Sequence, residues 1–354
     1  MIKKTYSQRL KSMKERRTDI DFIIKKSVTE NFSYASYLTE NYEGLKENDV
    51  YKYFIGSMEG VDKIYTNNTY KEAERVKNQL DKIKDNDLDF IYEYQGSVSN
   101  NTHIKAYSDI DILVLIEKFF TVEYPQVPKY PYRGDPVEDL MELRMKCEKH
   151  LTEAFYAANV DCTGAKSIGL SGGSLKRKID VVPSNWINTN EYSRSLNKVY
   201  RGVQVLDKYK RIRIKNTPFY HNYLLNEKDK ACSFNYKKII RLLKTLKADA
   251  DNKVDFNSYD IAAIVYSMDN LKFLVSDKQL LLLKNIKEHI DYILENSIYR
   301  ENLYVPDRSR KIFDDSSKIA GLKKLKTEID TLYYDIIDDL SRNRILLEKK
   351  AFAV

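Results

Sequence analysis

The sequence predicts an α+β protein, with a small mixed sheet between an N-terminal helical segment and a C-terminal helical bundle. Three observations predict this class. Up to about residue 90, Lys- and Glu-rich segments carry apolar residues three and four positions apart, as in YKEAERVKNQLDKI, which is the spacing of amphipathic helices. From there to about residue 207, short apolar runs alternate with turn residues, as strands do. After about residue 215 the helical spacing returns and persists.

The predicted strands are short segments that adjoin turn residues. They lie in DFIYEYQGSVSNNT (89–102), YSDIDILVLIE (107–117), KSIGLSGGSL (166–175), LKRKIDVVPSNW (175–186) and KVYRGVQVLD (198–207). Residues 124–139 hold four of the seven prolines and predict a loop. Asp135 and Pro136 are expected to be the N-cap and first position of the helix that follows.

The last part of the chain predicts a bundle of amphipathic helices. They lie in KKIIRLLKTLKADA (237–250), SYDIAAIVYSMDN (258–270), DKQLLLLKNIKEHIDYILENS (277–297) and IAGLKKLKTEIDTLYYDIIDDLSRNRILLEKK (319–350). We therefore expect one domain over residues 1–215, made of the N-terminal helices and the sheet, and a helical domain over residues 216–354.

The composition narrows the function. The 354 residues carry 60 basic and 52 acidic side chains, a formal charge of +8. This balance suits a ligand with phosphates but is too mild to predict binding to duplex DNA. No apolar run approaches the ~20 residues that cross a bilayer, so no membrane association is expected. The three cysteines and the lack of a signal peptide predict reduced thiols and a cytoplasmic protein.

Two carboxylates at the start of an apolar strand predict a metal site. Asp109 and Asp111 are expected to project on one side of their strand, because side chains alternate with period two. Two like charges at close range repel each other, and a divalent cation removes that cost. Two-metal sites also clamp the oxygens of an in-line phosphoryl displacement, and Asp180 in KIDVVP is the candidate third ligand.

Two further features accompany the acids. Gly96 and Ser97 precede Asp109 by eleven intervening residues, and a glycine there lets backbone N–H groups approach a phosphate. Lys176 and Lys178 share the face of Asp180 if that strand is regular.

In this order and strand context, these pieces resemble the nucleotidyltransferase superfamily signature. Within that superfamily the chain resembles the cGAS/DncV-like nucleotidyltransferases, the bacterial relatives of cyclic GMP–AMP synthase. The matching segments are GSVSNNTHIKAYSDIDILV, KIDVVPSNW, KNTPFYHN, NYKKIIRLLKTLK and FNSYDIAAIVYSM. The resemblance covers roughly residues 90–275. It implies a polymerase β-like core and an active site between two lobes. It also implies synthesis of a cyclic di- or trinucleotide from nucleoside triphosphates in anti-phage defence (CBASS).

The resemblance also implies roles for residues of this chain. Asp109, Asp111 and Asp180 would hold two Mg²⁺ ions, with Mn²⁺ as a possible substitute. Gly96 and Ser97 would bind the triphosphate. Lys244 would contact phosphate, Ser258 would hydrogen-bond the nucleotide, and Tyr259 would stack on a base.

Departures from the animal enzyme and from bacterial relatives refine these expectations. No Cys/His cluster has the spacing of the animal enzyme's zinc insertion, so no activation by double-stranded DNA is expected. Bacterial relatives commonly have Gly where this chain has Asn101, and Asn tolerates positive φ, so the turn is expected to survive. The family further implies an effector that binds the product rather than the enzyme, and accessory CBASS proteins as possible partners.

Two alternatives stay open from the sequence. The same acids would serve a non-cyclising nucleotidyltransferase that acts on an RNA, a protein or a small molecule. The segment from Lys237 to Tyr259 favours the cyclase. A degenerate transferase that only senses nucleotides is the second alternative, and the presence of all three acids argues against it.

Overall fold

The computed structural model describes residues 4–18, 41–106, 108–276 and 278–351. It divides the chain into two compact units, Asp62–Leu224 and a unit made of Met1–Val61 with Leu225–Val354. This division differs from the expected one, because the helices before residue 62 belong with the C-terminal bundle and not with the sheet. The reason is packing: Met13, Tyr53 and Phe54 are buried in the same apolar core as the helices that follow residue 225.

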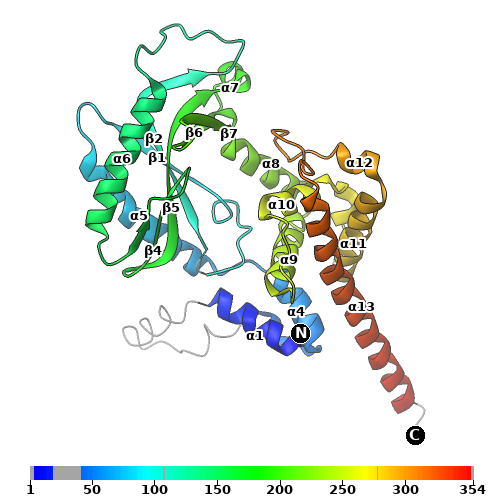
Figure 1. Cartoon of the computed structure of the whole chain (residues 1–354). Coiled ribbons are helices and arrows are strands. Elements are labelled where there is room, and N and C mark those ends of the chain that lie inside the picture. The colour runs from blue at the N-terminus through cyan, green and yellow to red at the C-terminus, as the bar shows by residue number, and fades with distance from the viewer. Residues whose placement is uncertain (1–3, 19–40, 107, 277, 352–354) are drawn as a thin grey trace. The chain divides into compact units, whose positions relative to one another are not determined.

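The unit formed by residues 62–224 is built on a seven-stranded mixed sheet (Figure 1). Its strands are β1 (Phe90–Gln95), β2 (Ile110–Val122), β3 (Asn159–Asp161), β4 (Ile168–Gly172), β5 (Leu175–Asn188), β6 (Gly202–Asp207) and β7 (Ile212–Asn216). The order is β1-β2-β5-β4-β3, and β6 joins β5 and is followed by β7. Strands β2 and β5 are parallel, whereas the other described pairs are antiparallel. The predicted mixed sheet is therefore confirmed.

Two long helices cover one face of this sheet, α5 (Lys63–Leu80) and α6 (Pro136–Ala154). The N-terminus of α6 is the predicted one, since the Asp135 side chain accepts hydrogen bonds from two backbone N–H groups and Pro136 is at the first position. Ile112 and Val114 of β2 are buried with apolar residues of both helices. Because side chains alternate along a strand, Asp111, Leu113 and Leu115 lie on the opposite face.

Pro183 stands within the central strand β5, a position that normally excludes proline. On one side β5 pairs with β2 throughout this region. On its other side β5 pairs with β4 as far as Val181 and with β6 from Ser184 onward. Pro183 thus lies in the interval where β5 changes partners, and a missing N–H donor costs least there.

The remaining short elements of this unit are η2 (Asp81–Ile83), α7 (Asn190–Ser195) and η3 (Lys198–Tyr200). The unit boundary at residue 224 falls within α8 (Pro218–Ala231).

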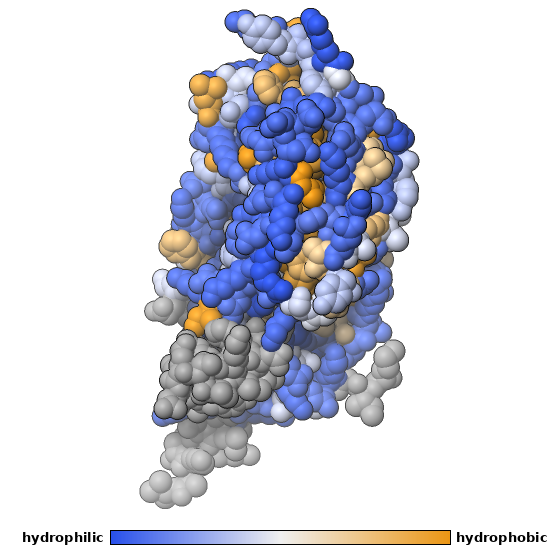
Figure 2. Space-filling view, turned by 90° about the vertical axis from the view of Figure 1, so that its left-hand side faces the viewer, coloured by the Kyte–Doolittle hydropathy of each residue, from blue (hydrophilic) through white to orange (hydrophobic). Residues whose placement is uncertain are grey.

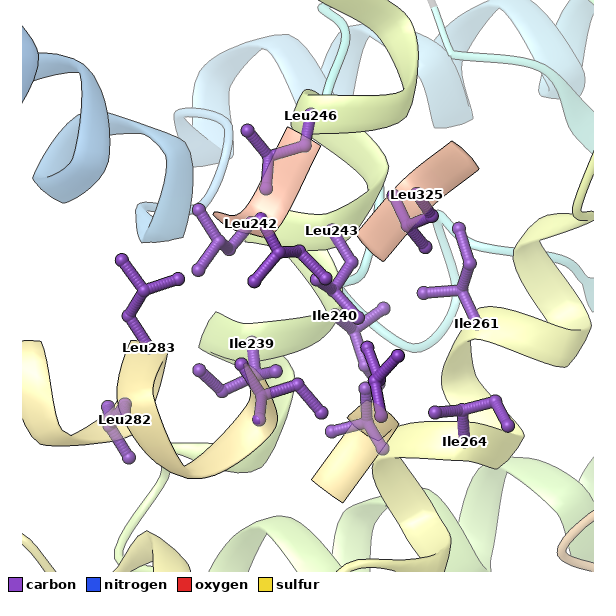
Figure 3. Packing of buried hydrophobic residues seen from close by; sticks show 14 of the residues in the cluster. Ile239, Ile240, Leu242, Leu243, Leu246, Ile261, Ile264, Leu282, Leu283 and Leu325 are labelled. Carbon is purple, nitrogen blue, oxygen red and sulfur yellow. The ribbon is translucent and has the colours of Figure 1, made fainter. Parts of the chain in front are cut away.

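The other unit is helical, which confirms the predicted bundle. Its described elements are α1 (Tyr6–Arg17), η1 (Asn41–Gly44), α4 (Asp49–Met58), α9 (Tyr236–Asp249), α10 (Ser258–Ser267), η4 (Asn270–Phe273), α11 (Gln279–Glu295), α12 (Ser297–Glu301) and α13 (Ser317–Ala351). Helix α9 is central: Figure 3 shows Ile240 and Leu243 on the side of Ile261 of α10 and Leu325 of α13, and Ile239 on the side of Leu282 and Leu283 of α11. Full burial of each such side chain contributes about 1.5–3 kcal/mol.

The surface view in Figure 2 shows mostly hydrophilic side chains with small separate hydrophobic patches. Within the described ranges, no helix has the length and hydropathy that crossing a membrane requires. All three cysteines are free thiols, and Cys147 is fully buried in α6.

Candidate active site

One lateral row of residues crosses the sheet at the end where β2 begins. Gln95 of β1 pairs with Asp111 of β2, Asp111 pairs with Asp180 of β5, and Asp180 pairs with Gly169 of β4. Residues paired across strands share a face, so the carboxylates of Asp111 and Asp180 are direct neighbours. This face is the one that α5 and α6 do not cover.

The two neighbouring carboxylates change the titration of Asp111. Burial, and then the negative charges of Asp180 and Asp109, raise the pKa of Asp111 from 3.8 to about 6. The charge of Lys178 and a hydrogen bond from the Gln95 side chain oppose this rise. A raised carboxyl pKa beside two other acids is typical of a site that binds a cation or moves protons.

The third acid already has a cationic partner. Nζ of Lys178 donates to Oδ2 of Asp180 over 2.9 Å, and Oγ of Ser167 lies 3.5 Å from the other carboxylate oxygen. The hydrogen bond to Asp180 raises the pKa of Lys178, with smaller contributions from Asp180, Asp109 and Asp111 as charges. The ammonium group of Lys178 therefore interacts electrostatically with all three predicted metal ligands, as expected from its position on the face of Asp180.

Asp109 is placed differently from the expectation of two acids within one strand. Strand β2 begins at Ile110, so Asp109 is the residue just before it. Its side chain is exposed, whereas that of Asp111 is largely buried. The two acids therefore differ in exposure to water although they are only two residues apart.

The predicted Gly-Ser turn lies directly beside Asp111. Gly96 has a φ of +92°, and a Cβ at this position would lie 3.2 Å from Oδ2 of Asp111. Both the backbone conformation and the close approach favour glycine. Half-buried Ser97 follows, and its carbonyl accepts from the N–H of Thr102 over 3.0 Å. Asn101 has a φ of +57°, which confirms that asparagine supports the turn in place of glycine.

Side chains hold this turn against the start of α8. Asn222 donates to Oγ of Ser99 over 3.0 Å and accepts from Nδ2 of Asn100 over 3.1 Å. Asn100 also accepts from Oγ1 of Thr102 over 2.7 Å. These contacts fix the loop that leads from β1 toward the acids.

The donor chemistry suits a hard divalent cation, because three carboxylates with a backbone turn beside them are typical of Mg²⁺ sites. The three carboxylates do not, however, lie close enough together to form a complete metal site. Among the residues that the structure describes, no three His, Cys, Asp or Glu side chains are gathered closely enough to hold a metal ion as they stand. The ligand types fit the ion, and one of them, Asp180, is ion-paired with Lys178.

The other predicted site residues belong to the helical unit. Lys244 is half-buried on α9, and Ser258 is the exposed first residue of α10. Tyr259 is partly buried, and the guanidinium carbon of Arg310 lies 5.4 Å from its ring centroid. Burial raises the pKa of the Tyr259 hydroxyl above its ordinary value. The structure thus brings the three acids and Gly96 together in one unit and places Lys244, Ser258 and Tyr259 in the other.

Sequence reasoning missed Gln95 and Gly169. The side chain of Gln95 donates a hydrogen bond to Asp111, and its Oε1 accepts from Nδ2 of Asn216 over 3.4 Å. Gly169 stands beside Asp180 and leaves room for its carboxylate, which a Cβ would approach to 3.4 Å. The only available signal was that Gln95 directly precedes Gly96, since the strand register cannot be obtained from local spacing.

Comparison with known proteins identifies the family that this chain is similar to. The family described as cGAS/DncV-like nucleotidyltransferase C-terminal helical domain matches residues 224–334. A cyclic dinucleotide synthase CdnE from Yersinia aleksiciae is 35% identical over 312 residues, which is 86% of this chain and 82% of the relative. A c-di-GMP synthase from Capnocytophaga granulosa is 31% identical and covers 82% of this chain and 89% of its own length.

Solved structures give the same result over nearly the whole chain. The STING-associated CdnE c-di-GMP synthase from Capnocytophaga granulosa has a TM-score of 0.75 at 30% identity, over 95% of this chain and 99% of that one. A STING-associated CdnE c-di-GMP synthase from Flavobacteriaceae sp. also has a TM-score of 0.75, at 26% identity over 94% of this chain and 99% of that one.

Proposed function

This chain belongs to the cGAS/DncV-like nucleotidyltransferases, and we propose that it joins nucleoside triphosphates into a cyclic dinucleotide second messenger for anti-phage defence. The observation that carries the proposal is the row at the end of the sheet. Asp111 and Asp180 are neighbours on parallel strands, Asp109 precedes Asp111, and the Gly96 turn lies beside them. Nucleotidyl transfer requires carboxylates that can hold metal ions and, beside them, a turn whose backbone N–H groups can bind a phosphate.

In the proposed reaction, a 3′- or 2′-hydroxyl of one nucleotide attacks the α-phosphate of another. A P–O bond forms, the bond to the β-phosphate breaks, and pyrophosphate leaves. The linear intermediate then undergoes a second attack that closes the ring. Most of the rate enhancement comes from positioning and charge stabilisation, so no covalent enzyme intermediate is needed.

We propose Mg²⁺ as the cofactor, as two ions, with Mn²⁺ as a substitute. Asp109, Asp111 and Asp180 would hold the ions. When bound, the ions lower the pKa of the attacking hydroxyl and neutralise the triphosphate. The protein's own contribution is the fixed register of Asp111 beside Asp180 and the rigid turn at Gly96.

The remaining site residues are proposed to bind the nucleotide. Backbone N–H groups and the Ser97 hydroxyl would bind the triphosphate, because the turn has a positive-φ glycine and no side chain at its apex. Lys244 would contact phosphate, Ser258 would donate a hydrogen bond from the exposed N-terminus of α10, and Tyr259 would stack on a base.

The names of the relatives select the first substrate to test. Two of the relatives described above are c-di-GMP synthases, so GTP is the leading candidate for both halves of the product. We propose synthesis in the cytoplasm without activation by double-stranded DNA. We also propose an effector that binds the product and not the enzyme, with accessory CBASS proteins as further partners. A trinucleotide product remains the alternative outcome of the same chemistry.

The test is product formation from labelled nucleotides. Purified protein is incubated with each α-labelled triphosphate in a mix of all four, with Mg²⁺ or Mn²⁺, and then treated with phosphatase. We expect a phosphatase-resistant product that mass spectrometry identifies as cyclic. Asp109→Asn and Asp180→Asn should each abolish it, while Asp87→Asn, an exposed acid before β1, should retain it. Near-normal synthesis by a folded Asp109→Asn or Asp180→Asn variant would contradict the assignment.

The second candidate is a non-cyclising transferase, and the same experiment separates it. The acids would be identical, but labelled nucleotide would then appear on an added RNA, protein or small molecule and not in a cyclic product. The match of residues 224–334 to the family's C-terminal helical domain favours the cyclase.

A further inference from the structure

Lys178 forms an ion pair with Asp180, one of the three acids. Its Nζ lies 2.9 Å from Oδ2 of Asp180. The side chain of Lys178 is 48% exposed and that of Asp180 is 16% exposed, so the ammonium group can reach water while the carboxylate is held in the sheet. A lysine ammonium is a compact charge on a flexible stem, which makes it an exchangeable partner.

Strand β4, which pairs with β5, has a glycine where the Lys178 side chain passes. Gly169 pairs with Asp180, and the Cβ of any other residue there would lie 3.7 Å from Cε of Lys178 and 3.4 Å from Oδ1 of Asp180. A branched side chain at this position would crowd both partners. The side chain of Lys178 therefore extends forward along β5 and passes Gly169 of the neighbouring strand. It ends at the carboxylate of Asp180, two residues later in the sequence.

The position is also unusual because a cation stands where metal ligands are expected. Asp109, Asp111 and Asp180 bring like charges together, which is unfavourable without a counterion. Lys178 supplies one positive charge inside the cluster. Half-exposed ion pairs contribute little net stability, so a divalent cation that contacts several carboxylates at once can displace the ammonium group.

We propose that Lys178 is a built-in counterion of the acid cluster, which occupies Asp180 until a divalent cation displaces it. This inference rests on the proposed function only in taking Asp180 as a metal ligand. Lys178 thereby sets the cation concentration at which Asp180 becomes available, and it is a positioning residue and not a catalytic one.

The experiment measures Mn²⁺ binding to the full-length protein without nucleotide, by calorimetry or by the electron paramagnetic resonance of free Mn²⁺. Lys178→Met should bind Mn²⁺ roughly two- to fivefold more tightly than the unmodified protein, the range expected for loss of an exposed ion pair. Lys178→Arg, which keeps the charge, should bind as the unmodified protein does. Lys176→Met is the matched control, since Lys176 is exposed on the same face two residues earlier, and its affinity should change much less.

Two outcomes would overturn the inference. If Lys178→Met binds Mn²⁺ no more tightly than the unmodified protein, no competition exists. If Lys176→Met tightens binding equally, the effect is general electrostatics and not displacement from Asp180. Asp180→Asn separates this inference from the proposed function: weakened binding in Asp180→Asn with unchanged binding in Lys178→Met removes only the counterion role. Equal Mn²⁺ affinity of Asp180→Asn and unmodified protein would remove Asp180 as a ligand and with it both proposals.

Discussion

Asp111 of β2 and Asp180 of β5 are register partners in a parallel strand pair, so two carboxylates stand side by side at one end of the sheet. The fold imposes this proximity, because seven consecutive residue pairs, from Ile110 with Ile179 to Ile116 with Asn185, share this register. Sliding one strand by a single residue would turn every apolar partner to the wrong face. The core therefore supplies the free energy that keeps two like charges together.

This relationship predicts a stability that depends on pH in the metal-free protein. The pKa of Asp111 is raised from 3.8 to about 6, so the folded state binds more protons than the unfolded state between these values. Stability accordingly falls as pH rises through that window, by at most about 3 kcal/mol. Asp111→Asn removes the cost, so in EDTA its Tm should exceed that of the unmodified protein at pH 8 and the gain should shrink toward pH 4.

The control for this prediction is Asp109→Asn. Asp109 is exposed and its charge is only a secondary cause of the Asp111 shift, so its gain at pH 8 should be smaller. A Tm gain of Asp111→Asn that is equal at pH 4 and pH 8 would show that the carboxylate is not strained by its neighbours.

Gly96 is predicted to resist any side chain. Gly96→Ala would place a Cβ 3.2 Å from Oδ2 of Asp111 and would force an L-residue to a φ of +92°. We expect a loss of about 1–2 kcal/mol of stability and a larger loss of product formation, because the carboxylate or the turn must move. Gly44→Ala is the control, since a Cβ there meets nothing within 4 Å. Unchanged product formation by Gly96→Ala would show that the conformation of this turn is not required for the reaction.

Local signals were predictable from the sequence and non-local ones were not. Asp135 and Pro136 act within one helix turn, and positive φ at Asn101 depends on that residue alone, so both could be predicted. The neighbour relation of Asp111 and Asp180 joins strands separated by a helix and two strands. The sequence pointed to it only through the choice of Asp180 as candidate third ligand and through the family resemblance.

The missed features share one physical cause. Gln95 and Gly169 acquire their roles from strand register, which the apolar pattern of single strands does not determine. Edge strand β7 carries the charged residues Arg213 and Lys215, which suit an edge. The placement of residues 1–61 with the C-terminal bundle depends on long-range packing. Amphipathic spacing predicts that a helix has an apolar face, but it does not predict which element that face packs against.

Arg144 is predicted to be essential for the loop that leads to β4. It is 1% exposed and donates to the carbonyl oxygens of Gly164 over 2.6 Å and of Ala165 and Ser167 over 3.1 Å. Arg144→Met would remove all three of these buried hydrogen bonds, so we expect a loss of at least about 2 kcal/mol by chemical denaturation. Because Ser167 lies beside Asp180, product formation should also fall.

Arg75→Met is the matched control for Arg144. Arg75 is 44% exposed and donates to Glu72 and to the backbone of Ser174. Its loss should change stability by less than about 1 kcal/mol. Equal effects of the two substitutions would mean that the buried contacts of Arg144 add nothing.

Asp260, the residue after Tyr259, is predicted to stabilise the helical unit through its buried ion pairs. The side chain is fully buried and accepts from Arg310 over 2.5 Å, from Lys318 over 2.9 Å and from Asn257 over 2.7 Å. Asp260→Ala removes the fully buried partner of Arg310 and Lys318, which then keep the more exposed Asp314, so it should cost about 2–3 kcal/mol. It should also release Arg310 from the Tyr259 ring and weaken nucleotide binding if Tyr259 stacks on a base.

Asp255→Ala provides the comparison for Asp260 within the same unit. Asp255 pairs with Lys253, and their side chains are 61% and 85% exposed, so its removal should barely change Tm. Stability is measured by denaturant unfolding and nucleotide binding by titration of GTP, both on the full chain. If Asp260→Ala unfolds at the same denaturant concentration as Asp255→Ala, the buried ion pairs contribute nothing. If it is destabilised but binds GTP normally, Asp260 supports the helices without supporting Tyr259. The combined loss is expected, because Arg310 contacts both the buried carboxylate and the aromatic ring.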